Sequence, residues 1–478
     1  MIKDFLKHSA IYGIGKFIAM AIGFLTLPII TTSLSPAEYG IFDLLNLCLI
    51  LLNLSIAMEV SQAVARFIND QTDKKDKQSY VSTAYFFSFI MYCIGGLIIY
   101  SMQSNLSEWI LNDATQFHLI LYLIPWLFLH GSFTFITNQF RWENKPREQT
   151  CLIALNGVLT LGFIFYFLTI IPPSIENLIQ AYLLALSIST VIGFVMIKRH
   201  AIMAFTFSPQ KLKIMLLFSL PLVPSSLAVF GQSYTDRVMI GQMINFDSLG
   251  IYGVAFKVAN LLSVITGVLQ LSVVPLIYKH HKENDAQNNF GKATNIYVFI
   301  ILSTILGISL FSPELFHFFI GQSFEGAIIF VPLLLAAIAF QSLSVFTPGL
   351  SIVKKTHYIA VINIAGFGIN IILNYIMIQY YGLMGAALAT TITAALICIA
   401  NIIVNQRHYT INYDYLKILF AMIVTALAIT ITSLISPTSI NTGFFVTKAF
   451  ISIAVISIIG YPLIYRDISA LIKGHQGK

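Results

Sequence analysis

Six ionisable residues lie inside long apolar stretches of this chain, where a charged group has no water beside it. They are Lys16, Asp43, Glu59, Asp236, Arg237 and Lys257. Ionisable side chains inside membrane-length apolar segments are costly and generally face a polar cavity or a counter-charge. Three bases and three acids of this kind could hold a polar or anionic cargo electrostatically, without covalent chemistry.

Helical spacing adds amides to the same faces. Residues three or four apart lie on one side of a helix, so Asn46 accompanies Asp43, and Asn260 accompanies Lys257. At about 1.5 Å per residue, Lys257 falls about 13 Å from the outer end of its predicted helix, near mid-membrane. We therefore predict a substrate-binding cavity lined by Lys16, Asp43, Asn46, Asp236, Arg237, Lys257 and Asn260.

Structural roles compete with this interpretation. Lys16 could snorkel to the cytoplasmic interface, as Lys448 is expected to do on the outer side. Asp236 and Arg237 could anchor the outer end of their helix at the interface. Glu59 is more typical of a structural carboxylate than of a substrate ligand.

A polar stripe, Asn363, Asn370 and Asn374, follows the spacing i, i+7, i+11 on one predicted helix. Such amides usually hydrogen-bond between membrane helices. A role in facing a sugar is the alternative.

Residues for other chemistry are not arranged as an active site. The ten histidines form no spaced metal cluster, and the four cysteines show no CxxC pattern. No catalytic, cofactor or ATP-binding motif occurs in a suitable context. We expect no cofactor, no catalytic residue and no enzyme activity, and we expect no ATP-driven transport by this chain alone.

The elements that carry these residues are membrane spans. Of 478 residues, 57% are hydrophobic and 10% are charged, whereas soluble domains are about a quarter charged. A spanning helix needs about 20 apolar residues. Such runs fall at about 9–33, 39–64, 79–102, 116–138, 150–171, 177–197, 213–236, 248–277, 293–312, 327–347, 357–379, 382–404, 415–435 and 443–465. The fold class predicted is therefore an all-α integral membrane protein with about fourteen transmembrane helices.

Basic residues predict the orientation of these spans. All but four of the 27 Lys and Arg residues fall at the termini or in alternate connections; the exceptions are Lys16, Arg237, Lys257 and Lys448. Because cytoplasmic loops carry the excess of Lys and Arg, both termini are predicted to be cytoplasmic. The net charge of +7 thus reflects topology, and we expect no nucleic-acid partner.

A weak internal repeat appears at an offset of about 210 residues. Leu34–Phe42 aligns with Ile244–Tyr252, and both segments end in Gly-Ile-aromatic. Six helices per half predict a parallel repeat, which suits a transporter with a central cavity. We predict a first bundle over 1–200, a second over 201–408, and two extra helices over 409–478.

Three segments resemble Wzx-type polysaccharide flippases, which belong to the superfamily of multidrug, oligosaccharidyl-lipid and polysaccharide exporters. They read FLTLPIITTSLSPAEYGIFDLL, LPLVPSSLAVFGQSYTDRVMIGQMINFDSLGIYGVAFKVANLL and YYGLMGAALAT. The resemblance implies two six-helix bundles in a V with alternating access. It implies a flippase that moves undecaprenyl-pyrophosphate-linked oligosaccharide repeat units to the outer leaflet of the bacterial cytoplasmic (inner) membrane, for O-antigen or capsule synthesis. Membrane lipids and polymerase machinery are the further partners implied.

Two other functions stay open. A drug or cation exporter of the same fold would favour a net acidic cavity, whereas the six intramembrane charges are balanced. A membrane polysaccharide polymerase would carry a long outer catalytic loop, and the longest outer connections predicted here run only about a dozen residues.

The topology can be tested by cysteine labelling. In a cysteine-free background, single cysteines near Asn112 and Phe324 should react with impermeant thiol reagents added outside. Cysteines near Lys75 and Lys282 should not react until the membrane is opened. Labelling of all four from one side would contradict the orientation.

Overall fold

The computed structural model describes residues 2–283, 285–353, 355, 357–435 and 442–465; side chains are described at 13, 15 and from 17 onward, except 271, 272, 275, 442 and 465. Within these ranges every regular element is a helix and no strand occurs. In hydrocarbon a helix satisfies each backbone N–H and C=O within its own segment. The prediction of an all-α membrane protein is confirmed.

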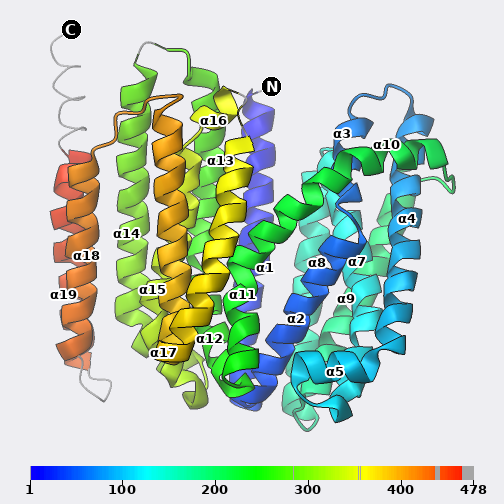
Figure 1. Ribbon diagram of the computed structural model, residues 1–478, viewed down its shortest axis with the longest axis horizontal. Coiled ribbons are helices and arrows are strands. Elements are labelled where there is room, and N and C mark those ends of the chain that lie inside the picture. The colour runs from blue at the N-terminus through cyan, green and yellow to red at the C-terminus, as the bar shows by residue number, and fades with distance from the viewer. Residues whose placement is uncertain (1, 284, 354, 356, 436–441, 466–478) are drawn as a thin grey trace. The chain divides into compact units, whose positions relative to one another are not determined.

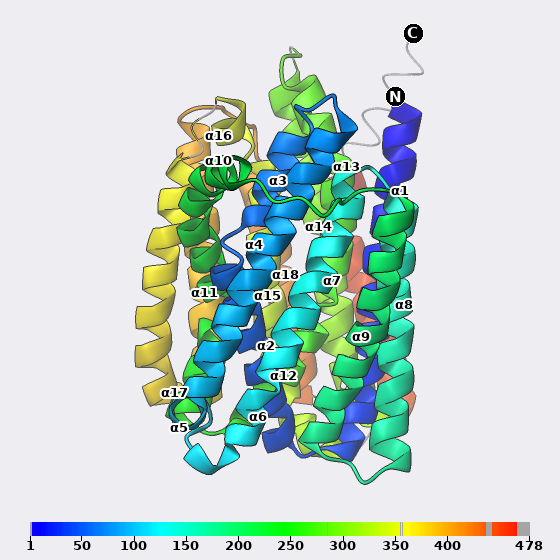
Figure 2. The same cartoon turned by 90° about the vertical axis from the view of Figure 1, so that its right-hand side faces the viewer.

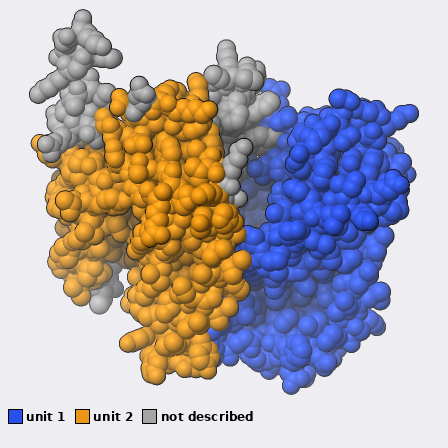
Figure 3. Space-filling view, turned by 45° about the horizontal axis from the view of Figure 1, so that its top comes forward, with its two compact units in different colours: residues 1–253 blue, residues 254–478 orange. Residues whose placement is uncertain are grey.

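The chain forms two compact units, Met1–Gly253 and Val254–Lys478, coloured blue and orange in Figure 3. The change of unit falls within a helix, α12. The predicted boundaries at 200 and 408 divide the chain by its internal repeat, whereas the two units are divided by compactness. The repeat boundaries stay a prediction.

Unit 1 consists of the first eleven α-helices, their short 3-10 and π segments, and the start of α12. Its elements are α1 (Ile2–Ser33), α2 (Pro36–Ile56), α3 (Val60–Ile68), α4 (Lys74–Ser101), α5 (Gln103–Leu111), η1 (Ala114–Gln116), α6 (Phe117–Leu121), α7 (Leu123–Trp142), α8 (Pro146–Phe165), η2 (Tyr166–Ile170), α9 (Ile175–Arg199), α10 (Pro209–Ser219), η3 (Leu220–Leu222), α11 (Val223–Met243) and α12 (Phe246–Ala259). Helices α4, α7, α9 and α8 pack successively, as Figure 2 shows, while α1 packs on α8 and α2 on α11.

Unit 2 continues from the end of α12. Its elements are α13 (Leu262–His280), α14 (Ala286–Phe319), η4 (Gln322–Phe330), α15 (Val331–Ser342), η5 (Leu343–Phe346), α16 (Gly349–Ile352), α17 (His357–Gln406), α18 (Tyr415–Ile435), α19 (Thr442–Gly460) and η6 (Tyr461–Tyr465). Helix α14 is central to the packing, because α13, α15, α18 and α19 all contact it; Figure 1 shows α18 and α19 on its outer side.

Twelve helical segments of the described residues are long and apolar enough to cross a membrane. One of them, α17, has 50 residues but bends at Gly382, whose φ of 56° and ψ of −134° are non-helical. This left-handed φ suits glycine, which has no Cβ to clash. The part of α1 from Phe17 to Ser33 is a shorter apolar helix. The total of fourteen spans stays a prediction.

Two predicted spans are interrupted. The span predicted over 39–64 ends with α2 at Ile56, because Met58 and Glu59 adopt left-handed φ values of 49° and 53° before α3 begins. The span predicted over 248–277 breaks between α12 and α13, where the N–H of Leu261 bonds to the carbonyl of Val258, three residues back. Such 3-10 tightening ends regular α-helix locally.

Connections predicted to share a membrane side do meet within each unit. In unit 1, Lys211 Nζ lies 2.9 Å from Asp76 Oδ1, and Lys145 Nζ lies 2.7 Å from His200 Nδ1. In unit 2 the Tyr409 hydroxyl donates to the His281 carbonyl at 3.1 Å. These contacts agree with the alternation of connections, and the cytoplasmic assignment of that side stays a prediction.

Asp414 fastens the start of α18 to α14. Its Oδ2 accepts from the Asn295 amide at 2.7 Å and from Lys417 Nζ at 3.0 Å. Burial raises the pKa of this carboxyl, but the two hydrogen bonds and the charge of Lys417 outweigh burial, so the pKa lies below its ordinary value.

A buried ion pair fastens α19 to α14. Lys448 Nζ lies 2.8 Å from Oε1 and 3.0 Å from Oε2 of Glu314, and both residues are buried. The expectation that Lys448 snorkels is wrong, because α14 continues to Phe319 and carries Glu314 to the height of Lys448 on its inner face. The Lys448 ammonium is thus stabilised by the Glu314 carboxylate inside the bundle and not by water at the membrane interface.

The two segments of the internal repeat contact each other. Ser35 caps α2 through a capping box with Glu38, and Asn245, its equivalent by the offset, accepts the N–H of Ser248 at 2.8 Å. Past these caps the backbones touch. A Cβ on Gly40 would lie 2.1 Å from the Phe246 carbonyl oxygen, and one on Gly250 would lie 1.9 Å from that of Pro36.

This contact predicts the effect of two alanine substitutions. Gly40→Ala and Gly250→Ala should each lower the thermal midpoint of the purified protein in detergent, because overpacking costs about 1–3 kcal/mol. Gly162→Ala in α8 is the matched control, because nothing lies within 4 Å of its Cβ position. It should keep or raise the midpoint, since alanine favours helix. Equal midpoints for all three variants would contradict the close contact.

Candidate functional site

An ion pair between α2 and α11 lies at the centre of the candidate site in unit 1. Arg237 Nη1 lies 3.0 Å from Oδ2 and 3.3 Å from Oδ1 of Asp43. The side chains of Arg237 and Asp43 are 6% and 13% exposed. A charge-assisted pair this far from water is strongly attractive and tightly held.

Asp236 adds a second carboxylate to this cluster. Its Oδ2 accepts the Tyr252 hydroxyl of α12 at 2.7 Å, and its Oδ1 accepts the N–H of Arg237 at 2.8 Å. The guanidinium of Arg237 also lies 5.1 Å from the centre of the Tyr234 ring, within cation–π range. We call Asp43, Asp236, Arg237 and Tyr252 the outer-end cluster, after the predicted side of α2 and α11.

The alternative that Asp236 and Arg237 anchor an interface is wrong, since they are only 1% and 5% exposed. The cluster holds two carboxylates and one guanidinium. In this conformation Arg237 is therefore engaged by acids of its own unit. No group of three metal-ligating side chains occurs among the described residues.

The other predicted site residues are described one by one. Asn46 is half-buried on α2, one turn beyond Asp43. Lys257 and Asn260 are half-buried at the end of α12, in unit 2. The side chain of Lys16 lies outside the described residues. The hydrogen bonds and the ion pair given above join Asp43, Asp236 and Arg237, and the seven-residue cavity stays a proposal.

Sequence reasoning missed Tyr252 as a member of the cluster. It is fully buried, and its hydroxyl is satisfied by Asp236. The signal was present in the Gly-Ile-aromatic ending of the repeat, but the equivalent Phe42 has no hydroxyl and stacks instead on Trp126, with ring centres 5.7 Å apart.

Asn370 and Asn374, two members of the asparagine stripe, are engaged in packing within α17. Asn374 Nδ2 donates to the Asn370 carbonyl at 3.0 Å, and Asn370 Nδ2 lies 3.4 Å from Thr393 Oγ1 beyond the Gly382 bend. Asn370 and Asn374 are buried. The Asn374–Asn370 bond lies within the first arm of α17. The Asn370–Thr393 contact joins the two arms, as expected for an amide between membrane helices.

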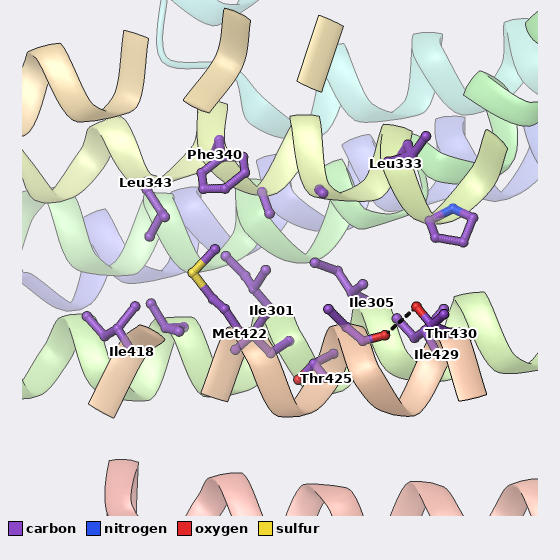
Figure 4. Close-up of a pocket in the computed structure, with 16 residues that line it drawn as sticks. Ile301, Ile305, Leu333, Phe340, Leu343, Ile418, Met422, Thr425, Ile429 and Thr430 are labelled. Atoms are coloured by element: carbon purple, nitrogen blue, oxygen red, sulfur yellow. Dashed lines mark hydrogen bonds between the residues drawn. The ribbon is translucent and has the colours of Figure 1, made fainter. Parts of the chain in front are cut away.

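Unit 2 contains an apolar pocket of about 280 Å³ between α14, α15 and α18. Figure 4 shows Ile301, Ile305, Phe340 and Met422 on its walls. The hydroxyls of Thr425 and Thr430 bond to carbonyls of their own helix. The walls therefore offer hydrocarbon contact alone, which suits an alkyl or isoprenoid chain.

Comparison with known proteins decides the family. The model of a family described as "Polysaccharide biosynthesis protein" matches residues 29–329, which is more than half of the chain. The chain belongs to this family. The match begins in α1 and ends in η4, so it includes every residue of the outer-end cluster.

Individual proteins that align with this chain have low sequence identity to it. A "Putative O-antigen transporter" of Shigella flexneri is 20% identical over 82% of this chain and 95% of its own length. A "Probable low-salt glycan biosynthesis flippase" of Haloferax volcanii is 22% identical over 42% of each chain. The alignment thus spans less than half of that archaeal protein.

Solved structures share the fold. A "Lipid II flippase MurJ, inward closed conformation" superposes with a TM-score of 0.75 over 96% of this chain and 99% of its own, at 15% identity. A multidrug resistance MATE family transporter superposes with a TM-score of 0.67 over 84% and 94%, at 17% identity. The chain therefore has the transporter fold that these proteins have in common.

The buried pair predicts a large effect of neutralising Asp43. Asp43→Asn removes the carboxylate that pairs with the Arg237 guanidinium and should cost about 3–5 kcal/mol, seen as a lower thermal midpoint in detergent. Replacing both residues, Asp43→Leu with Arg237→Met, should recover much of the loss.

The matched control is Asp70→Asn. Asp70 pairs with Arg66 at an exposed end of α3, where an ion pair contributes only about 0–1 kcal/mol. Equal effects at Asp43 and Asp70, or a double variant as unstable as Asp43→Asn, would contradict the assigned role of the pair.

Proposed function

We propose that this protein is a flippase that moves undecaprenyl-pyrophosphate-linked oligosaccharide repeat units from the cytoplasmic to the outer leaflet. The observation that carries the proposal is the family match over residues 29–329 of a chain with many membrane-spanning helices. The product would enter O-antigen or capsule synthesis. The membrane is the bacterial cytoplasmic membrane, with both termini in the cytoplasm.

The nature of the similar proteins supports this proposal. A putative O-antigen transporter aligns with most of the chain, and a lipid II flippase shares its fold over nearly all of it. Both names refer to carbohydrate-containing cargo, and lipid II is itself a lipid-linked glycan. None of these proteins is named for a catalytic activity.

The chemistry of the cargo indicates which residue types would bind it. A pyrophosphate needs cationic partners, for which Lys offers a compact charge and Arg a bidentate fork. Lys257, Arg237 and Lys16 are the proposed partners. The apolar pocket of unit 2 offers a surface for the isoprenoid chain. Because Arg237 is held by Asp43, it joins the cargo only when that pair opens.

A multidrug or cation exporter is the second candidate. The observation that favours it is the excess of carboxylate in the outer-end cluster, together with the likeness to a multidrug transporter fold. A net acidic site attracts cations, whereas a pyrophosphate carrier needs exposed bases. Cargo charge therefore separates the two functions.

Reconstitution tests the proposal. Purified protein in liposomes should translocate an undecaprenyl-pyrophosphate glycan. Lys257→Glu should abolish translocation at normal membrane abundance, and Lys257→Arg should reduce it less, because the positive charge is kept. Lys16 variants should follow the same order with smaller effects. Arg237 variants should follow the same order too, but they also break the buried pair with Asp43, so their translocation is compared at matched membrane abundance.

The control is Lys355→Glu, a charge reversal at an exposed connection, which should leave translocation unchanged. Full translocation by a normally abundant Lys257→Met variant would remove Lys257 from the site. Efflux of organic cations without any movement of the glycan lipid would favour the exporter. Release of free glycan or polymer would indicate an enzyme.

A further inference from the structure

The loop between α9 and α10, residues 200–208, is fastened to α4 on the outside of unit 1, as Figure 2 shows. It contains no regular helix. The N–H of Ala204 donates to Ser82 Oγ at 2.9 Å, and the N–H of Ser208 donates to Thr83 Oγ1 at 3.0 Å. Ser82 and Thr83 are fully buried. The backbone of the loop is therefore held in one place along α4.

The side chains of this loop divide between the core and the outside. Ile202 is only 4% exposed and belongs to the hydrophobic core of unit 1. Phe205 is 91% exposed and Phe207 is 48% exposed. Exposing a phenyl ring to water is unfavourable. Because buried hydroxyls fix the backbone, the fold itself directs these two rings outward, and they need an apolar environment outside the chain.

Phe205 lies well beyond the charged start of α4. Its ring centre is 6.1 Å from that of Phe86, which lies about 18 Å along α4 from Lys74. The next turn of α4 presents Phe89 and Ile90, which are also exposed. The headgroup layer on one side of a bilayer is only about 5–7 Å thick. The Phe205 ring is therefore placed at the depth of acyl chains when the start of α4 lies at the headgroups.

Basic residues gather at the charged end of this surface. Five of them are exposed and make no ion pair with the residues that the structure describes: Lys74 and Lys75 of α4, Lys198 and Arg199 of α9, and Lys213 of α10. The neighbouring carboxylate Asp76 is already paired with Lys211 at 2.9 Å. The surface thus combines an excess of positive charge with aromatic rings that lie deeper, the combination by which proteins bind anionic lipid.

We propose that loop 200–208 and the five bases form a binding site for an anionic phospholipid. The bases contact the phosphate of the headgroup, while Phe205 and Phe207 lie against its acyl chains. Because α10 continues through η3 into α11, the bound lipid also steadies the helix that carries Arg237. The inference goes beyond the proposed function and does not depend on it, because the ligand is a lipid of the membrane and not the cargo.

The depth of the loop can be measured directly. A nitroxide on Phe205→Cys, in the cysteine-free protein, is placed in vesicles of phosphatidylcholine and phosphatidylglycerol. It should collide more with oxygen, which concentrates in hydrocarbon, than with a water-soluble nickel complex. A nitroxide on Lys74→Cys is the control and should show the opposite preference. Free access of the nickel complex to position 205 would overturn the proposal and leave the two phenylalanines to a protein partner.

The preference for anionic lipid is measured at the same position. A fluorophore on Phe205→Cys should be quenched by nitroxide-labelled phosphatidylglycerol at lower concentration than by nitroxide-labelled phosphatidylcholine. Replacing Lys198 and Arg199 by Gln should reduce this preference about fivefold per base, which corresponds to about 1 kcal/mol each. Exchanging the two, Lys198→Arg with Arg199→Lys, should keep it. Added salt should weaken it, because surface charges are screened.

The matched control removes the same charge from unit 2. Lys282→Gln with Lys292→Gln, at two exposed positions, should leave the preference at position 205 unchanged. Thermal midpoints in detergent show whether each variant is folded. Equal quenching by the two lipids in the otherwise unaltered protein would overturn the proposal. So would an equal loss of preference in the unit 2 control.

Discussion

A charged group inside hydrocarbon must find a counter-charge, water or a polar wall, and this requirement organises much of the structure. A single charged residue at the centre of a membrane helix costs at least about 2.5–3.5 kcal/mol. Arg237 meets the requirement with Asp43 between α2 and α11, and Lys448 meets it with Glu314 between α19 and α14. Each pair sits where two helices pack, so each specifies a neighbour as well as neutralising a charge.

The same requirement links packing to transport in the proposed mechanism. Replacing a buried pair costs little, but separating its members costs much. An anionic cargo that binds Arg237 must therefore compete with Asp43, and the contact of α2 with α11 weakens when it succeeds. Asp236 is less free to respond, because Tyr252 and the N–H of Arg237 already occupy its oxygens. In the proposed mechanism the same charged group, the Arg237 guanidinium, thus serves both the binding of cargo and the contact between α2 and α11.

Besides the buried ion pairs, close backbone contact holds helices together. Between membrane helices there is no hydrophobic driving force of the kind found in water, so small residues allow the van der Waals contact that holds helices together. Gly40 and Gly250 do this at equivalent positions of the internal repeat. Their neighbours differ in chemistry, since Tyr252 bonds to a carboxylate and Phe42 stacks on Trp126. The two copies of the repeat therefore share the glycine contact but differ in the chemistry of the aromatic residue beside it.

The sequence alone determined the helical membrane class, the approximate positions of the spans and the residues worth suspecting, because hydrocarbon length and the cost of buried charge act on local composition. It indicated the Gly-Ile-aromatic repeat and the importance of Asp43, Asp236 and Arg237. It could not pair Asp43 with Arg237, 194 residues away, nor Lys448 with Glu314, because pairing depends on which helices become neighbours. The left-handed break at Met58 and Glu59 was also hidden, since neither residue type signals it. Only the tertiary structure showed that the loop before α10 directs Phe205 outward, because its backbone is held by Ser82 of α4, 122 residues from Ala204.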